Sequence, residues 1–353
     1  MKTEHLLIIR FSALGDVAMT VPVVSALAHQ YPDLRITVLS RSFMRPLFDG
    51  IAPNVGFMGA DLKKEYHGIR GLNALYRRLV AKNFTAVADL HNVLRSSYLR
   101  MRFNAARYRV EHIDKNRKGR RMLTRKEGKQ MVQQQTSFEK YADVLARLGY
   151  PVKLDFVSLF PPEGGPMEEI ADVIGEKKMS EKWIGVAPFA AHDGKIYPQE
   201  KTLEVIRLLQ SKHPSARFFL FGGGDSEVEV MDRWAKDLPS CTVVPHLLKG
   251  FRQELILMSH LDVMLSMDSA NMHLASLVAT PVVSVWGATH PYAGFTGWNQ
   301  SEENNIQTDL PCRPCSIYGN RPCLRGDYAC LNNITPQRIA DRIEETLNTR
   351  TKQ

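Results

Sequence analysis

An acidic residue follows the first apolar run of the chain, where enzymes with parallel sheets often bind their ligands. Asp16 comes after Gly15 in the turn Ser12–Asp16, which itself follows the apolar run His5–Arg10. Because ligands of open α/β sheets bind at the carboxyl ends of strands, Asp16 is a candidate general base that takes the proton of an attacking hydroxyl group. The alternative is that Asp16 only caps the next helix, a position that aspartate favours.

A second turn of this kind begins at Asp268, after the apolar run Leu261–Met267. Asp268 and Ser269 precede a helical pattern, and the free N–H groups and positive dipole end of a helix N-terminus suit a phosphate group. Capping of the helix by either side chain is the alternative. His273 lies one turn further, where a histidine is more often a packed residue than a catalyst.

Two loops between these turns add further candidates. Lys195 lies in the loop Ala187–Pro198, where a cation can neutralise a leaving diphosphate, although one loop lysine alone means little. Gly222 begins a run of three glycines after a strand, and glycine lets a ligand approach the backbone closely. The run lacks the GxGxxG pattern, which argues against a nicotinamide dehydrogenase, and a plain flexible turn is the alternative.

Four of the five cysteines lie within nineteen residues, at positions 312, 315, 323 and 330. Four thiolates this close suit tetrahedral zinc, but the second pair lacks the CxxC spacing of common zinc sites. Reduced structural thiols and a redox-dependent disulfide are the alternatives. A disulfide framework is not expected in a cytosolic protein of this size.

The elements that must position these residues alternate between strands and helices. The apolar runs predict strands at 5–10, 35–40, 86–91, 183–188, 216–221, 261–267 and 281–286. A helix is predicted over 17–29, with a kink at Pro22. The alternation restarts after residue 180, and the Pro- and Gly-rich stretch Phe160–Pro166 is the natural linker. We therefore expect an α/β protein with two Rossmann-like doubly wound domains, residues 1–165 and 166–353.

Length and composition agree with two globular domains. The chain has 353 residues, of which 44% are hydrophobic and 24% charged, which excludes a disordered or coiled-coil protein. No apolar run approaches the roughly 18–20 residues of a membrane span or the core of a signal peptide. We therefore expect a cytoplasmic protein whose membrane contact is at most peripheral.

The positive charge is concentrated in the window Leu94–Gln130, which holds thirteen basic and three acidic residues, a net +10 against +9 for the whole chain. Nine of the thirteen are arginine, which can form two hydrogen bonds to one phosphate. The window predicts a docking site for a phosphorylated substrate or an anionic membrane; the alternative is a solvated loop and helix face. Its three aromatic residues all lie at its start, which disfavours a nucleic-acid partner.

Three segments together resemble one family. The segments Arg10–Pro22 (RFSALGDVAMTVP), Asp268–Ala275 (DSANMHLA) and Pro281–Pro291 (PVVSVWGATHP) resemble the bacterial heptosyltransferases of glycosyltransferase family 9. The resemblance implies a GT-B type architecture with two domains facing across a cleft. It also implies an inverting transfer of heptose from ADP-heptose to the inner core of lipopolysaccharide, with no cofactor and no catalytic metal ion.

The resemblance implies roles for the candidates. Asp16 would be the base, and Lys195 would balance the diphosphate. The implied donor-binding residues are Asp268, Ser269, Ala270, Met272, His273 and Gly222. The implied acceptor-binding residues are Ser12, Gly15, His91 and Arg95. The expected partners are ADP-heptose, an anionic glycolipid of the lipid A–Kdo type and, peripherally, the inner membrane surface. A related transferase with another nucleotide sugar or glycan acceptor is the main alternative, and a nucleotide-sugar epimerase is a further one.

Overall fold

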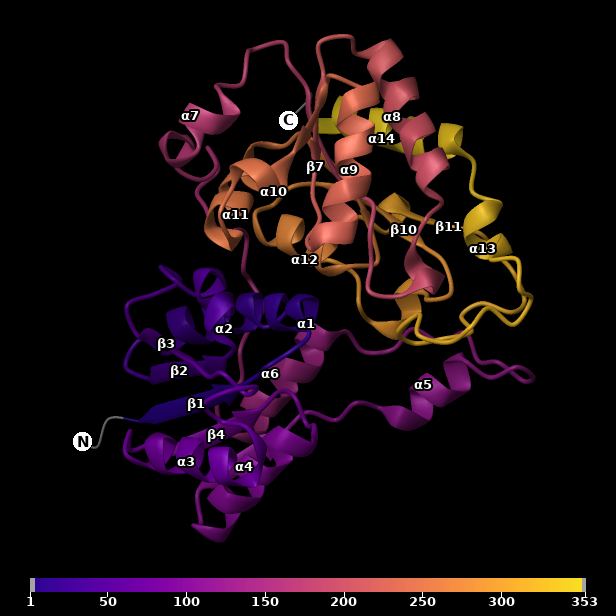
Figure 1. The fold of residues 1–353 in the computed structure, drawn as a ribbon. Coiled ribbons are helices and arrows are strands. Elements are labelled where there is room, and N and C mark those ends of the chain that lie inside the picture. The colour runs from indigo at the N-terminus through magenta and orange to yellow at the C-terminus, as the bar shows by residue number, and fades with distance from the viewer. Residues whose placement is uncertain (1–3, 351–353) are drawn as a thin grey trace. The chain divides into compact units, whose positions relative to one another are not determined.

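The computed structural model describes residues 4–350 and forms two compact units, each with its own parallel sheet (Figure 1). Within the described part of the chain, unit 1 comprises residues 4–116 and Gln135–Val157, and unit 2 comprises Arg117–Gln134 and residues 158–350. The predicted fold class, two doubly wound α/β domains, is confirmed. The boundary expected after residue 165 stays a prediction.

Unit 1 has five parallel strands in the order β3-β2-β1-β4-β5. The strands are β1 (His5–Ile9), β2 (Arg35–Ser40), β3 (Val55–Gly59), β4 (Ala86–Asp89) and β5 (Arg109–His112). Leu7 and Ile9 on β1 pack into a core with Leu75 of α3 and Phe103 of α4, whereas α2 lies on the other side of the sheet (Figure 1). Both faces are therefore covered, which explains the continuous apolar runs in these strands.

The helices of unit 1 are α1 (Leu14–Ala18), α2 (Val21–Gln30), α3 (Gly68–Val80), α4 (Leu94–Ala105) and α6 (Ser137–Arg147), with a 3₁₀ turn at Ser42–Leu47. The prediction of one kinked helix over 17–29 is wrong, because Pro22 stands in the first turn of a second helix. Proline lacks the N–H group that a continuous helix needs there, but its fixed φ suits a helix start. The shorter α1 begins at Leu14 and contains Asp16.

Unit 2 has six parallel strands in the order β11-β10-β9-β6-β7-β8. They are β6 (Trp183–Ala187), β7 (Arg217–Leu220), β8 (Cys241–Val243), β9 (Val263–Met267), β10 (Val282–Trp286) and β11 (Asn305–Gln307). The helices are α5 (Arg117–Leu123), α7 (Ala171–Ile174), α8 (Gln199–Lys212), α9 (Asp225–Asp237), α10 (Val244–Leu247), α11 (Phe251–His260), α12 (Ala270–Leu277), α13 (Ala329–Asn332) and α14 (Pro336–Arg350). Short 3₁₀ turns occupy 167–169, 193–195, 291–293 and 302–304.

Each sheet has a point where the strand order reverses, and all the candidate residues except Gly222, which comes after β7, follow the strands that flank it. In unit 1 this point lies between β1 and β4, where Ile9 pairs with Asp89. In unit 2 it lies between β6 and β9, where Ala187 pairs with Ser266. Ligands of open α/β sheets bind at such a point, beyond the carboxyl ends of the strands.

The basic window is divided between the two units. Residues 117–134, which we call the basic excursion, belong to unit 2, although the chain before and after them belongs to unit 1. Lys129 donates hydrogen bonds to the carbonyl oxygens of Cys312 (2.8 Å) and Pro314 (3.0 Å), and the Arg120 guanidinium lies over the Phe295 ring. Among the described residues, no helix combines the length and apolar character that a bilayer crossing requires.

Candidate functional site

Asp16 forms an ion pair at the carboxyl end of β1. Arg10 Nη2 lies 2.6 Å from Asp16 Oδ2, and the same oxygen accepts a hydrogen bond from the backbone N–H of Ala13 at 3.2 Å. The Asp16 side chain is 27% exposed, whereas Arg10 is buried. The Asp16 carboxylate therefore binds the backbone at the start of α1 and is also the candidate base. Arg10 holds it in place, and it remains open to solvent.

His91 reaches the same edge of the sheet from β4. Its Nε2 lies 3.4 Å from Ser12 Oγ, and the residue is only 8% exposed. Burial, together with the charges of Arg10 and Lys115, lowers the pKa of His91 to about 3. His91 is therefore a neutral imidazole near pH 7, able to share a hydrogen bond but not to add positive charge.

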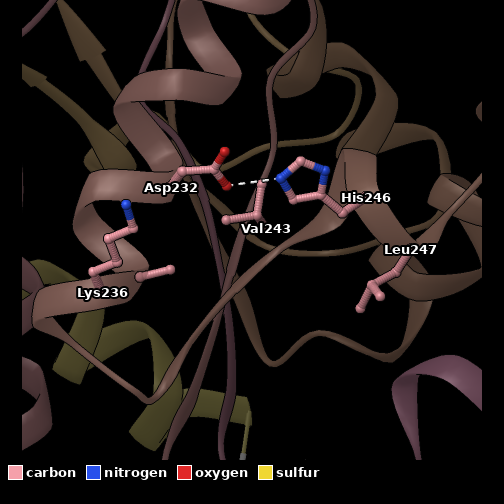
Figure 2. Close-up of a pocket in the computed structure, with 6 residues that line it drawn as sticks. Asp232, Lys236, Val243, His246 and Leu247 are labelled. Carbon is pink, nitrogen blue, oxygen red and sulfur yellow. Dashed lines mark hydrogen bonds and ion pairs between the residues drawn. The ribbon is translucent and has the colours of Figure 1, made fainter.

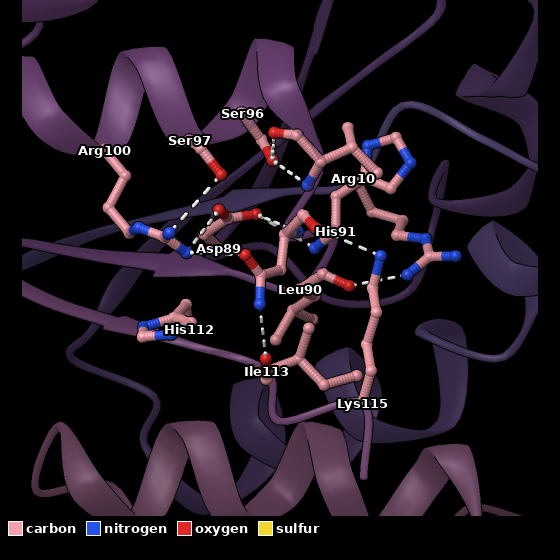
Figure 3. A network of polar contacts seen from close by, with 12 residues as sticks. Arg10, Asp89, Leu90, His91, Ser96, Ser97, Arg100, His112, Ile113 and Lys115 are labelled. Carbon is pink, nitrogen blue, oxygen red and sulfur yellow. Dashed lines mark hydrogen bonds and ion pairs between the residues drawn. The ribbon is translucent and has the colours of Figure 1, made fainter. Parts of the chain in front are cut away.

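A buried carboxylate holds the turn that carries His91, as Figure 3 shows. Asp89 accepts hydrogen bonds from the backbone N–H groups of His91 and Asn92, both at 2.9 Å, and pairs with Arg100 at 3.2 Å. Asp89 is completely buried, so these partners compensate a charge that would otherwise be costly to bury. The same turn accepts a hydrogen bond from Arg10 Nη1 at Leu90 O, 2.6 Å away.

Sequence reasoning missed Arg10, Asp89 and Arg100 as parts of this site. A charged residue that ends an apolar strand, as Arg10 does, was the available signal. The predicted strand over 86–91 ends at Asp89, since the Asp89 side chain binds the next N–H groups and turns the chain.

The structure brings together most of the residues expected on the acceptor side. Ser12 contacts His91, and Gly15 is the second residue of α1, directly before Asp16. Arg95 stands in the first turn of α4 with its side chain exposed. The acceptor-binding roles of these residues stay predictions.

Lys195 and Asp268 meet at the strand-order reversal of unit 2. Lys195 Nζ lies 3.0 Å from Asp268 Oδ2, and the two side chains are 16% and 5% exposed. Lys195 ends a 3₁₀ turn in the loop after β6, and Asp268 directly follows β9. Two loops that are far apart in sequence thus place one shielded ammonium group at this edge of the sheet.

The N-terminus of α12 lies directly after Asp268. Ser269 is the residue before the first turn, but its side chain makes no capping hydrogen bond; its Oγ lies 3.2 Å from Ser266 Oγ instead. The first N–H groups of a helix, here from Ala270 onward, have no acceptor within the helix. Met272 and His273 are buried, so contacts from this turn to a ligand would come from the backbone. Such a terminus favours an anion.

The glycine run after β7 is partly occupied by the protein itself. The Gly223 N–H donates to Glu227 Oε2 at 2.8 Å, and α9 begins at Asp225. The Glu227 carboxylate on this turn would repel the phosphate groups of a ligand, so the geometry adds no support for a donor-binding role of Gly222. The donor-binding role of Gly222 stays a prediction.

All five cysteines are free thiols, and the four clustered ones line one small cavity together with Arg313 and Arg325. Burial raises the pKa of Cys330 to about 11 and that of Cys241 to about 12. Within residues 4–350, no group of three or more His, Cys, Asp or Glu side chains is arranged to hold a metal ion.

A separate pocket of about 440 Å³ lies on unit 2 between α9 and α10 (Figure 2). Asp232 Oδ1 and His246 Nε2 lie 2.7 Å apart on its wall, and the side chains are 40% and 54% exposed. The residues that line it are Asp232, Ala235, Lys236, Val243, His246 and Leu247. None of them is a predicted site residue.

Comparisons with known proteins identify the family. A family model described as glycosyltransferase family 9 (heptosyltransferase) matches residues 72–322. The lipopolysaccharide core heptosyltransferase OpsX of Haemophilus influenzae is 23% identical over 322 residues, which cover 87% of each chain. Among solved structures, a glycosyltransferase family 9 protein of Veillonella parvula superposes with a TM-score of 0.73 at 17% identity, covering 99% of this chain and 98% of that one.

A further solved structure, the Escherichia coli heptosyltransferase WaaC with ADP, superposes with a TM-score of 0.68 at 19% identity, covering 97% of this chain and 99% of that one. Likeness at this level shows a shared fold, the GT-B type expected from the sequence. The family match extends over most of the chain and includes both Lys195 and the α12 turn. The chain therefore belongs to glycosyltransferase family 9, the heptosyltransferases, and is a glycosyltransferase.

Proposed function

We propose that this enzyme transfers heptose from ADP-heptose to the inner core of lipopolysaccharide. The observation that carries the donor assignment is the shielded Lys195–Asp268 pair beside the uncapped N-terminus of α12. The names of OpsX and of WaaC with ADP support the lipopolysaccharide and adenine-nucleotide assignments.

In this proposal, unit 2 stabilises the leaving group. When the bond between the anomeric carbon and the phosphate oxygen breaks, negative charge develops on the ADP diphosphate. Lys195 and the first N–H groups of α12 are fixed before the reaction, so they stabilise that charge without reorganising. The low exposure of Lys195 strengthens the interaction, because charges attract more strongly away from bulk water.

Unit 1 supplies the base. The acceptor hydroxyl group attacks the anomeric carbon and passes its proton to an Asp16 carboxylate oxygen. Arg10 binds the Oδ2 atom and favours the ionised form that a base requires. His91 and Ser12 lie at the same edge, where they would bind acceptor hydroxyl groups, and the exposed Arg95 would bind an acceptor phosphate or carboxylate.

In this proposal, the basic excursion binds the enzyme to an anionic membrane surface. Its exposed basic side chains are Arg117, Lys118, Arg121, Arg125 and Lys126, followed by the exposed apolar Met131 and Val132. Clustered positive charge beside exposed apolar groups suits a membrane of anionic lipids. We propose that the enzyme works in the cytoplasm, peripherally at the inner membrane.

The decisive test is ADP release from ADP-heptose, measured with and without a deacylated lipid A–Kdo acceptor. We expect release to require the acceptor and to fall about 10²–10⁴-fold in Asp16→Asn, the usual contribution of a general base. Asparagine keeps an oxygen for the Ala13 N–H but cannot take up the proton. Asp33→Asn, at an exposed position of the same unit, is the control and should retain wild-type turnover.

Other results would change the assignment. If the enzyme turns over a different nucleotide sugar and not ADP-heptose, the family assignment stands and the proposed donor is wrong. If Asp16→Asn keeps full activity, Asp16 is not the base and only caps the helix. Release without any acceptor would favour a hydrolase or epimerase type of reaction.

A further inference from the structure

The segment around the cysteine cluster is packed against the loop that carries Lys195. Gly319, between Cys315 and Cys323, has a φ of +75°, and a methyl group on its Cα would lie 2.6 Å from Lys195 Cγ and 3.1 Å from Cδ. The aliphatic part of Lys195 therefore passes directly over the Gly319 backbone. A side chain at position 319 must displace the lysine.

Gly319 is itself held in place by Ser316. The buried Ser316 Oγ accepts hydrogen bonds from the backbone N–H groups of Gly319 (3.0 Å) and Tyr318 (3.3 Å) and donates one to Asn320. This small turn is rigid because its backbone donors are satisfied within it.

The backbone beside Lys195 is fixed from the same segment. The carbonyl of Gly194 accepts a hydrogen bond from the Ala288 N–H at 2.7 Å, and the Ala288 carbonyl accepts from the N–H groups of Cys315 and Ser316 at 3.1 and 3.2 Å. One residue of the loop after β10 thus joins the lysine loop to the start of the cysteine cluster.

Arg313 holds this junction together. Its guanidinium, 5% exposed, donates to the carbonyl oxygens of Gly287 (2.5 Å) and Thr289 (2.9 Å), on either side of Ala288. Further bonds run to Thr308 O and Gln307 Oε1. Burying an arginine with this many acceptors fixes the loop after β10 in one conformation.

We propose that residues 313–319 of the cysteine-rich segment form a positioning element for Lys195. Gly319 sets the path of the lysine side chain, and Arg313 fixes the backbone that supports it. This inference rests on the proposed role of Lys195 at the donor diphosphate. It gives the segment a function in the reaction that needs neither a bound metal nor a disulfide.

Two glycines of the same segment provide a matched pair of variants. Gly326 has a φ of +79°, close to that of Gly319, but a methyl group there has no atom within 4 Å. Gly319→Ala and Gly326→Ala therefore carry the same backbone strain, and only the first meets Lys195.

The first measurement is the rate at which an amine-acylating reagent modifies Lys195, followed by peptide mass spectrometry in the absence of any nucleotide. We expect slow modification in the wild-type protein, because Lys195 is shielded and paired with Asp268. Gly319→Ala should raise the rate several-fold, and Gly326→Ala should leave it unchanged. Equal rates in all three proteins would overturn the proposal, whatever the enzyme transfers.

The second measurement is ADP affinity by calorimetry, in the wild-type background and in Lys195→Met. Gly319→Ala should weaken ADP binding about tenfold, or about 1.4 kcal/mol, and Gly326→Ala less than twofold. In Lys195→Met the effect of Gly319→Ala on ADP affinity should disappear. If Gly319 acts only through Lys195, the losses of binding free energy from the two substitutions do not add. Additive effects would contradict the positioning role.

The two measurements separate this inference from the proposed function. If the wild-type protein binds no ADP but only Gly319→Ala changes the labelling of Lys195, the proposed donor is wrong and the positioning of Lys195 by residues 313–319 stands. Tight ADP binding that both glycine variants weaken equally would retain the donor and refute the positioning element. Thermal melting of each variant checks that the loss is not unfolding.

Discussion

At the scale of single residues, each unit holds a candidate charged side chain that is fixed by an ion pair. Asp16 is bound by Arg10, and Lys195 by Asp268, and each pair lies where the strand order of its sheet reverses. Their places after apolar strands made Asp16, Lys195 and Asp268 candidates, and the resemblance to the family implied their roles. The sequence could not predict the pairing, because the partner of Lys195 is more than seventy residues away and no local pattern links the two.

His91 gives a pH-dependent prediction at this scale. Its pKa in the folded protein, about 3, lies below the ordinary value of 6.5. Between these values the unfolded chain binds more protons than the folded one, so the contribution of His91 to stability falls as the pH drops from 6.5 towards 3. We expect His91→Gln to lose less unfolding free energy than the wild-type protein between pH 7 and pH 5.

Urea denaturation at the two pH values measures this difference. His67→Gln, at an exposed position of unit 1, is the control and should follow the wild-type pH dependence. If His91→Gln and the wild-type protein lose stability in parallel on acidification, the imidazole is not kept neutral by its surroundings.

At the scale of elements, turns rather than strands carry the candidate residues. Seven of the eleven strands in the described residues were predicted, since runs of β-branched and leucine residues identify buried parallel strands; the predicted 35–40 coincides with β2. The four strands that were not predicted, β3, β5, β8 and β11, are the edge strands of the two sheets. Turns were predicted less well. The helix break at Pro22 and the end of β4 at Asp89 depend on single side chains that compete with regular backbone pairing.

The β4–α4 turn gives the prediction at this scale. Asp89→Asn removes the charge that pairs with Arg100 and that binds the N–H groups of His91 and Asn92. We expect the unfolding free energy to fall by roughly 1.5–3 kcal/mol, the range for hydrogen bonds to a charged group. Activity should fall further than stability explains, because Leu90 of this turn also binds Arg10.

Chemical denaturation and turnover at a temperature where the variant stays folded test the two parts separately. Asp155→Asn, an exposed carboxylate of unit 1, should change neither. Normal turnover in a destabilised Asp89→Asn protein would show that the turn supports the fold without supporting the base.

At the scale of the whole molecule, the charge is uneven. The net charge is +9, and a single window of the sequence accounts for all of it. Sequence reasoning identified this window but not its division between the two units. That division rests on contacts such as Lys129 with Cys312, 183 residues apart, which leave no trace in local composition.

Binding to anionic vesicles provides the prediction at this scale. The wild-type protein should float with phosphatidylglycerol vesicles at low salt and be released as ionic strength rises, because exposed charges are screened over about 10 Å at 0.1 M salt. The triple variant Arg117→Glu, Arg121→Glu and Arg125→Glu should lose this binding. Turnover of the soluble, deacylated acceptor should change much less.

A charge-matched control changes three exposed basic residues elsewhere on unit 2, namely Lys178→Glu, Arg207→Glu and Lys249→Glu. This protein has the same net charge as the excursion variant and should retain most of its vesicle binding. Equal loss in both triple variants would mean that total charge matters and the excursion does not.

The basic excursion also restricts where two related sequences can be joined to make a chimera. The chain passes between the units three times, after residues 116, 134 and 157, so no single cut separates them. A chimera made by one crossover near residue 157 would combine the excursion of one parent with the Cys312–Pro314 carbonyls of the other. Moving unit 2 intact from one parent to another therefore requires residues 117–134 to come from the same parent as the C-terminal half.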